Sequence, residues 1–150
     1  MDPRQIFLAI AATASLLVAG DVSAQSAPSA TRSDSYVQNE RGIATEQPGP
    51  HEGLGTTTAY PFFEQAKDFE LIFRKRALHP GATIGAHVND KDEIYYVLSG
   101  KGELTLQGKT REVGPGDAVL TRNGDSHALK QLGAEDLVIF IVYRKQAVRR

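Results

Sequence analysis

The sequence predicts an all-β protein that folds as one small sandwich or barrel. Short segments rich in β-branched and aromatic residues recur along the chain, with Gly-rich turns between them. After residue 24, no stretch of ten residues has a convincing helical pattern. The chain has 150 residues, 41% of them hydrophobic, which is enough for one domain with a normal core.

The predicted strands follow one another through the second half of the chain. Around residues 69–74, Phe69, Leu71 and Phe73 recur at every second position, which is the period of a strand. The later segments with strand character are Glu93–Leu98, Glu103–Leu106, Thr110–Val113, Ala118–Thr121, Ser126–Gln131 and Leu137–Tyr143. The last of them is apolar at successive positions, which predicts burial on both of its faces.

Residues 1–24 have the features of a signal peptide. Arg4 precedes a run of apolar residues, and a small-residue cleavage motif ends at Ala24. We therefore expect cleavage before Gln25 and export, either to the periplasm or out of the cell. The apolar run is shorter than the ~20 residues that span a bilayer, so no stable membrane span is expected after cleavage. The alternative is an uncleaved N-terminal anchor.

Three further regions are expected after the signal peptide. Residues 25–58 are rich in Ser, Thr, Gly, Pro, Gln and Ala. Such a segment buries too little apolar area to offset the entropy of ordering it, so we predict a flexible, disordered linker. Residues 59–146 are expected to form the folded domain, and residues 147–150 a basic tail.

The charge and cysteine content limit the classes of function and of stabilisation. The chain has 17 Lys and Arg against 18 Asp and Glu, and no basic stripe, so we predict no nucleic-acid binding. It has no Cys, so an exported form has no disulfide to stabilise it. Stability must then come from packing, with a bound metal as a further source.

Four residues are spaced like metal ligands on neighbouring strands. In a strand, residues two apart share a face, so His87 and Asn89 point the same way. A turn after Asn89 brings Glu93 back beside this pair. His127 arrives from a later strand, after its own Gly-rich turn. Two imidazole nitrogens, a carboxylate oxygen and an amide oxygen can thus converge inside a barrel.

The spacing of these residues resembles the first of the two motifs of the cupin superfamily. That motif has a Gly, five residues, His-x-His, three or four residues, Glu, six residues and a second Gly. Here it reads Gly81, five residues, His87-x-Asn89, three residues, Glu93, six residues and Gly100. Asn89 stands where the family has its second His.

The second cupin motif is also similar. The family has a Gly, five residues, Pro-x-Gly, two residues, His, three residues and Asn. Here it reads Gly116, five residues, Arg122-x-Gly124, two residues, His127, three residues and Gln131. Seven of the ten positions in the two motifs agree.

The resemblance implies a single jelly-roll barrel over about residues 60–143, with one divalent metal near its centre. The family's ligands match His87, Glu93 and His127, whereas Asn89 departs from the pattern. The amide oxygen of Asn89 is a weak donor, which either coordinates the ion or faces a metal-bound water. Mixed nitrogen and oxygen donors suit Fe, Mn, Ni or Zn. The alternative is a barrel that keeps the glycines of the fold and has lost the metal.

Five other residues are weaker candidates for a role at the site. Tyr95 shares the strand parity of the predicted carboxylate ligand; we favour an interior tyrosine over a proton donor or a substrate contact. Arg74 and Arg76 either form a solvated face, which we favour, or clamp a substrate carboxylate. His51 either lies on a flexible loop, which we favour, or closes the barrel mouth. His79 precedes a proline and is expected to be structural.

Two classes of function follow. The first is an exported metalloenzyme that acts on a small oxygenated molecule by Lewis-acid or dioxygen chemistry. The resemblance leaves oxygenase, decarboxylase, isomerase and lyase reactions open, because the fold does not choose the reaction. The second is a barrel that binds a sugar or a carboxylate without turning it over. In both cases the partner is a small molecule, and a homodimer formed through edge strands is a further possibility.

Overall fold

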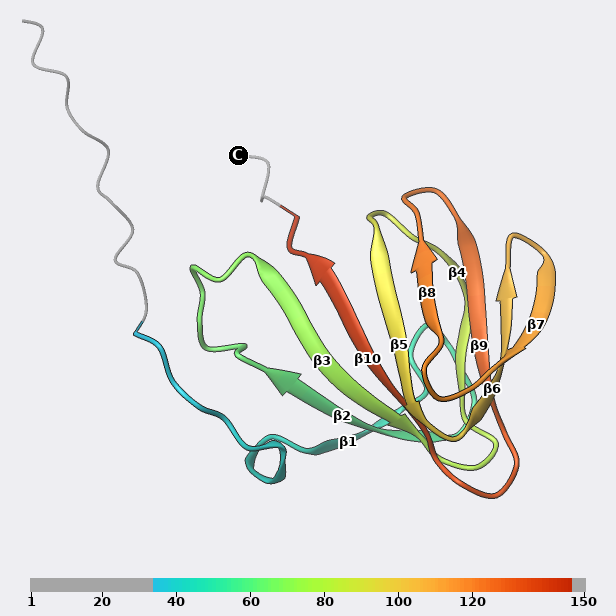
Figure 1. Ribbon diagram of the computed structural model, residues 1–150, viewed down its shortest axis with the longest axis horizontal. Coiled ribbons are helices and arrows are strands. Elements are labelled where there is room, and N and C mark those ends of the chain that lie inside the picture. The colour runs from blue at the N-terminus through green and yellow to red at the C-terminus, as the bar shows by residue number, and fades with distance from the viewer. Residues whose placement is uncertain (1–33, 147–150) are drawn as a thin grey trace, which may run out of the picture. The chain divides into compact units, whose positions relative to one another are not determined.

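The computed structural model describes residues 34–146, which form two facing β-sheets with the core between them (Figure 1). This part of the chain has one short 3-10 helix, η1 (Glu40–Gly42), and otherwise only strands. The strands are β1 (Thr45–Pro48), β2 (Thr56–Phe62), β3 (Leu71–Leu78), β4 (Thr83–Val88), β5 (Glu93–Ser99), β6 (Lys101–Leu106), β7 (Lys109–Val113), β8 (Ala118–Thr121), β9 (Ser126–Leu132) and β10 (Leu137–Arg144). The all-β prediction is confirmed.

The strands pair in an order that joins distant parts of the sequence. One sheet has the order β1-β2-β3-β10-β5-β8 and the other has the order β4-β9-β6-β7. In the first sheet, the interior strand β10 pairs antiparallel with β3 on one side and with β5 on the other. Within residues 34–146, no helix has the length and apolar character needed to cross a bilayer. The predicted signal peptide and basic tail lie outside these residues.

Side chains from both sheets fill the core. In β5, buried and exposed residues alternate strictly from Glu93 to Leu98, as expected for a strand with one face on a core. The largest fully buried apolar side chains are Leu78, Ile84, Val97, Leu104, Leu129, Leu137 and Ile139. Burying each of them contributes about 1.5–3 kcal/mol relative to leaving it exposed.

The predicted burial of β10 is confirmed for one face, and the other face is half-buried. Leu137, Ile139 and Ile141 are buried in the core, and the residues between them are half-buried. On the outer face, the ring of Phe140 stacks on Phe73 of β3, with 4.8 Å between ring centroids. This aromatic pair covers the second face of the strand.

The structure differs from the predicted linker over residues 45–58. β1 and the start of β2 lie there and pair with each other from Thr45–Ala59 to Pro48–Thr56. β2 in turn pairs with β3, and Thr57 is fully buried. The composition of this segment does not allow it to fold alone. As the edge of an existing sheet, however, it gains backbone hydrogen bonds that its own apolar content does not provide.

The loop between β1 and β2 docks against β4. The Gly85 N–H donates to the carbonyl of Pro50 at 3.0 Å, and the Thr83 N–H donates to the carbonyl of Leu54 at 3.0 Å. A Cβ atom on Gly85 would lie only 1.9 Å from the carbonyl oxygen of His51. Glycine at this position is therefore what lets the loop approach the strand so closely.

We predict that Gly85→Ala lowers the free energy of unfolding by about 2 kcal/mol, because the added methyl group overlaps backbone atoms and pushes the loop away. Gly114→Ala is the matched control, since a Cβ atom on Gly114 would have no neighbour within 4 Å. Urea unfolding of both variants checks the prediction. Equal stability of the two variants would contradict the close docking of the loop.

Candidate metal centre

Three strands bring His87, Glu93 and His127 together. His87 lies near the end of β4, Glu93 begins β5 and His127 is the second residue of β9. β4 and β9 are paired so that His87 stands directly opposite His127. One ligand atom from each of the three side chains lies within 4.8 Å of the others. The predicted convergence of two imidazoles and a carboxylate is therefore present in the fold.

A β-bulge turns His87 toward this cluster. Ile84 stands opposite Leu129, and both are buried in the core. Strict alternation from Ile84 would point residue 87 away from the core, because the two positions are three apart. The register shifts between Ile84 and His87, so β4 has one residue more than β9 in this interval. The extra residue returns His87 to the inner face.

The hydrogen bond made by His87 leaves one of its nitrogens free to bind a metal. Its Nδ1 lies 2.9 Å from the carbonyl oxygen of Gly85. Because a carbonyl only accepts, Nδ1 carries the proton and a neutral ring has its lone pair on Nε2. Donor atoms on one ion are at most about 4.4 Å apart, since each bond is about 2.0–2.2 Å long. Small side-chain rotations thus bring the three donors within reach of a single ion.

His127 is a buried, neutral donor. The residue is 2% exposed, and its Nε2 lies 3.7 Å from Glu93 Oε2. Burial, together with the neighbouring His87 and His51, lowers the pKa of His127 to about 4. A neutral imidazole can bind a cation without first losing a proton. The Nδ1 of His127 is also buried and has no hydrogen-bond partner among the described residues.

Tyr95 supports His127 from the same face of β5 as Glu93. Its hydroxyl lies 3.0 Å from His127 Nε2, and the residue is 4% exposed. Burial raises the pKa of Tyr95 well above its usual value, and the Glu93 carboxylate adds to this effect. The hydroxyl therefore keeps its proton. The favoured interpretation, an interior tyrosine with a hydrogen-bonded hydroxyl, is confirmed.

Asn89 has a structural role beside the cluster. It is 4% exposed, and its Nδ2 donates to Thr121 Oγ1 at 2.6 Å. The Thr121 hydroxyl in turn donates to the backbone carbonyl of Glu93 at 3.3 Å. These bonds tie the end of β4 to the start of β5, where the carboxylate ligand lies. Coordination of an ion by Asn89 stays a prediction.

A cavity of about 460 Å³ opens beside two of the three candidate ligands, His87 and Glu93. His87, Glu93 and Tyr95 form part of its wall, and Arg74 and Arg76 of β3 form another part. The favoured interpretation of these arginines as a solvated face is wrong for Arg76, which is 5% exposed. Its Nη1 donates to Thr57 Oγ1 at 2.6 Å. Burial is the main effect that lowers the pKa of Arg76.

His51 lies on the loop between β1 and β2, as expected, and it also lines this cavity. Its ring stacks on His87, with 3.5 Å between centroids and 6° between planes. Both His51 and Glu52 have positive φ angles, 55° and 59°. Residues other than glycine adopt this conformation only where the surrounding structure holds them in it. Here the hydrogen bonds between the loop and β4 do so.

His79 lies away from the cluster and is structural, as predicted. Its Nδ1 lies 3.0 Å from Asp136 Oδ1, and its Nε2 lies 3.0 Å from Thr58 Oγ1. The ring thus links β2 to the turn between β9 and β10. No signal in the local sequence identifies Asp136 and Thr58 as its partners.

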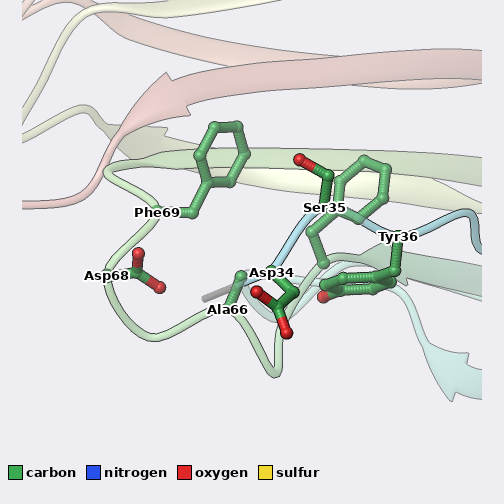
Figure 2. A pocket seen from close by; sticks show the side chains of 7 residues that line it. Asp34, Ser35, Tyr36, Ala66, Asp68 and Phe69 are labelled. Carbon is green, nitrogen blue, oxygen red and sulfur yellow. The ribbon is translucent and has the colours of Figure 1, made fainter. Parts of the chain in front are cut away.

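A second cavity, of about 470 Å³, has a different character (Figure 2). Its lining is aromatic and acidic, and it comes from the start of the described chain and from the loop between β2 and β3: Asp34, Ser35, Tyr36, Phe63, Ala66, Asp68 and Phe69. None of these side chains is an imidazole or a cation. The candidate metal ligands therefore lie at the other cavity, beside His87.

Comparison with known proteins supports the same assignment. Residues 75–143 match the family model described as the cupin domain. This segment contains all three residues of the cluster, and it runs from β3 to β10 of the double sheet. The described domain therefore has the fold of a small cupin.

Three relatives show the range of similar proteins. The oxalate-binding protein of Thermotoga maritima is 35% identical over 72 residues, which is 47% of this chain and 60% of that protein. A 5-nitrosalicylic acid 1,2-dioxygenase of Bradyrhizobium is 24% identical over 66 residues, 44% of this chain and 32% of that protein. The crystal structure of a predicted oxalate decarboxylase of Thermotoga maritima superposes with a TM-score of 0.67 and 26% identity, covering 74% of this chain and all of that one. The chain spans less than two thirds of the length of the oxalate-binding protein and of the dioxygenase.

We predict that Tyr95→Phe lowers the free energy of unfolding of the metal-free protein by about 1–3 kcal/mol, because His127 Nε2 then lacks its buried partner. Tyr96→Phe is the control, since Tyr96 is the next residue in β5 and is 44% exposed. Urea unfolding in the presence of a chelator measures both effects. A Tyr95→Phe protein as stable as the control would show that this hydrogen bond does not contribute.

Proposed function

We propose that this protein is exported, holds one divalent metal ion on His87, Glu93 and His127, and acts on a small oxygenated organic molecule in the adjoining cavity. The observation that carries the proposal is the convergence of three donor side chains from β4, β5 and β9 within 4.8 Å. The names of the two curated relatives support it, since they refer to oxalate and to 5-nitrosalicylic acid, both small acids. The signal-peptide features of residues 1–24 support export.

A bound divalent ion supplies Lewis-acid polarisation of an oxygen group or, with a redox metal, activation of dioxygen. Fe, Mn, Ni and Zn all suit two imidazoles and one carboxylate. Around this position the protein contributes orientation: the Gly85 carbonyl accepts from Nδ1 of His87 and leaves its Nε2 free for an ion. An ion on Nε2 of His127 would replace the hydrogen bond from the Tyr95 hydroxyl. Because Tyr95 stays protonated, its hydroxyl is a hydrogen-bond donor at the cavity wall.

A barrel that binds a small ligand without turnover is the second candidate function. It is favoured by the printed name of the Thermotoga maritima relative, an oxalate-binding protein. Product formation separates the two candidates. Turnover by metal-loaded protein in a screen of small hydroxy, keto and aromatic acids supports the enzyme, whereas ligand-induced stabilisation with no product supports the binding protein.

We predict that protein purified without added metal contains one divalent ion per chain, and that His127→Ala and Glu93→Gln remove it, because each leaves only two strong donors. Asn89→Ala is expected to weaken metal affinity much less. Elemental analysis measures the metal content. Thermal denaturation measures the stabilisation, which is about 2.7 kcal/mol at a free metal concentration of 100 Kd.

His79→Ala is the matched control for the metal experiment, because this histidine contacts Thr58 and Asp136 outside the cluster. It is expected to keep the metal. The proposal fails if no divalent ion co-purifies and none added raises the melting temperature.

We also predict that the mature protein begins at Gln25 when the full chain is expressed in a bacterial host, since the small-residue motif ends at Ala24. Intact-mass measurement of the exported fraction checks this. A chain that keeps residues 1–24 and stays with the membrane fraction supports the anchor instead.

A further inference from the structure

We propose that Arg74 and Arg76 form an anion subsite in the metal cavity, so that the ligand is a small organic acid with a second oxygen group. Its carboxylate binds the arginines while the second group faces His87, Glu93 and His127. This inference rests on the proposed function and specifies the substrate class. It excludes a neutral sugar, which the sequence leaves open.

The pairing of β3 places both arginines on the inner face of the sheet. Arg74 stands opposite Ile141 of β10, and Arg76 stands opposite Ile139. Both isoleucines belong to the core, and residues directly opposite in a sheet share a face. Lys75, between the two arginines, has the opposite orientation.

The hydrogen bonds of Arg76 leave part of its guanidinium group without a partner. Nη1 donates to Thr57 Oγ1 at 2.6 Å and Nη2 donates to Gln47 Oε1 at 3.3 Å, both neutral acceptors. Nε is buried and has no hydrogen-bond partner, and the same holds for Nε of Arg74. Both residues line the cavity, but their Nε atoms are covered by other protein atoms, so a ligand would reach the guanidinium groups through their Nη atoms.

Neither arginine has a negative partner of its own. Across residues 34–146, no ion pair joins Arg74 or Arg76 to a carboxylate. Burying an unpaired charge is unfavourable, and Arg76 is 5% exposed. An anion from solvent would neutralise this charge and accept the free N–H groups. A guanidinium binds a carboxylate through two parallel hydrogen bonds, and the two Nη groups of Arg74 can supply such a pair.

The charges around the cavity favour an anion as well. Its lining has three permanent cations, Arg74, Arg76 and Lys91, and two carboxylates, Asp90 and Glu93. Lys91 and Asp90 pair with each other. Glu93 is the proposed metal ligand, so its charge is used by the ion. The two arginines therefore remain as positive charge available to a ligand.

The subsite and the metal ligands lie within the reach of one small molecule. Arg74, Ile141 and Tyr95 form one row across β3, β10 and β5. Neighbouring strands are about 4.8 Å apart, so the row spans about 10 Å of backbone, and the arginine side chain extends along it. Tyr95 at the end of this row contacts His127. A cavity of about 460 Å³ holds an acid of a few carbon atoms together with its water.

Titration of malonate and of its monoamide, malonamate, into metal-loaded full-length protein tests the subsite by calorimetry. The two probes have the same shape, but the amide has lost one charge. We expect the wild-type protein to bind malonate at least about tenfold more tightly, since a charge-assisted contact is stronger than a neutral one. We expect Arg74→Met and Arg76→Met each to reduce this preference to less than about threefold, because each removes one of the two charged donors.

Lys75→Met is the matched control, because it removes a cation from the same strand on the other face of the sheet. It is expected to keep the preference for malonate. If Arg76→Met does not fold, two other variants decide the result. Arg74→Met is better tolerated because Arg74 is less buried than Arg76. Arg76→Lys keeps a positive charge at position 76. The inference is overturned if wild type binds both probes equally, or if Arg74→Met keeps the full preference.

Elemental analysis of the same samples distinguishes a failure of the proposed metal-dependent function from a failure of the anion subsite. A wild-type protein that binds no metal contradicts the proposed function. In that case the malonate preference, measured on the metal-free chain and on Arg74→Met, still decides the anion subsite. Protein that holds its metal and lacks the arginine-dependent preference contradicts the subsite alone.

Discussion

The register between β4 and β9 is the constraint on which the site depends. One extra residue of β4 between Ile84 and His87 lets Ile84 face Leu129 in the core while His87 faces His127. Without that bulge, the two imidazoles would lie on opposite sides of the sheet, because side chains alternate from face to face. Gly85 lies within the bulge. Its carbonyl oxygen bonds His87, and its missing Cβ admits the backbone of His51. A single irregularity thus sets the position of one ligand and of its stacking partner.

The inner faces of the strands change from polar to apolar along their length. β5 presents Glu93 and Tyr95 before Val97, and β3 presents Arg76 before Leu78. The apolar end supplies the burial that stabilises the fold. The polar end carries buried charges and hydrogen-bonding groups that cost stability unless they are paired. In the described structure, their partners are mostly each other, and the unpaired donors are Nε of Arg74 and Arg76 and Nδ1 of His127. The gradient therefore separates the apolar part of the interior, which stabilises the fold, from the polar part, which contains the candidate site.

The residues around the cavity have two different origins. The three candidate ligands lie within residues 75–143, the segment shared with the cupin domain family. His51 and Arg74 lie outside it and join the same wall through the docked loop and through β3. The shared segment thus contains the three side chains that could hold an ion. These two residues line the same cavity as His87 and Glu93. Differences in specificity between proteins that share a fold are expected to arise from such positions outside the shared segment.

The sequence by itself determined the all-β fold, the limits of several strands and the three candidate ligands. Ala118–Thr121 is a strand in both the prediction and the structure, because alternation and Gly-rich turns are local signals. Only the tertiary structure decided the pairing of β1, the stacking of His51 on His87 and the inward direction of Arg76. Each of these depends on a segment far away in the sequence. Local composition records how a segment behaves alone, and it does not record which distant backbone or side chain will supply its hydrogen bonds and cover its surface.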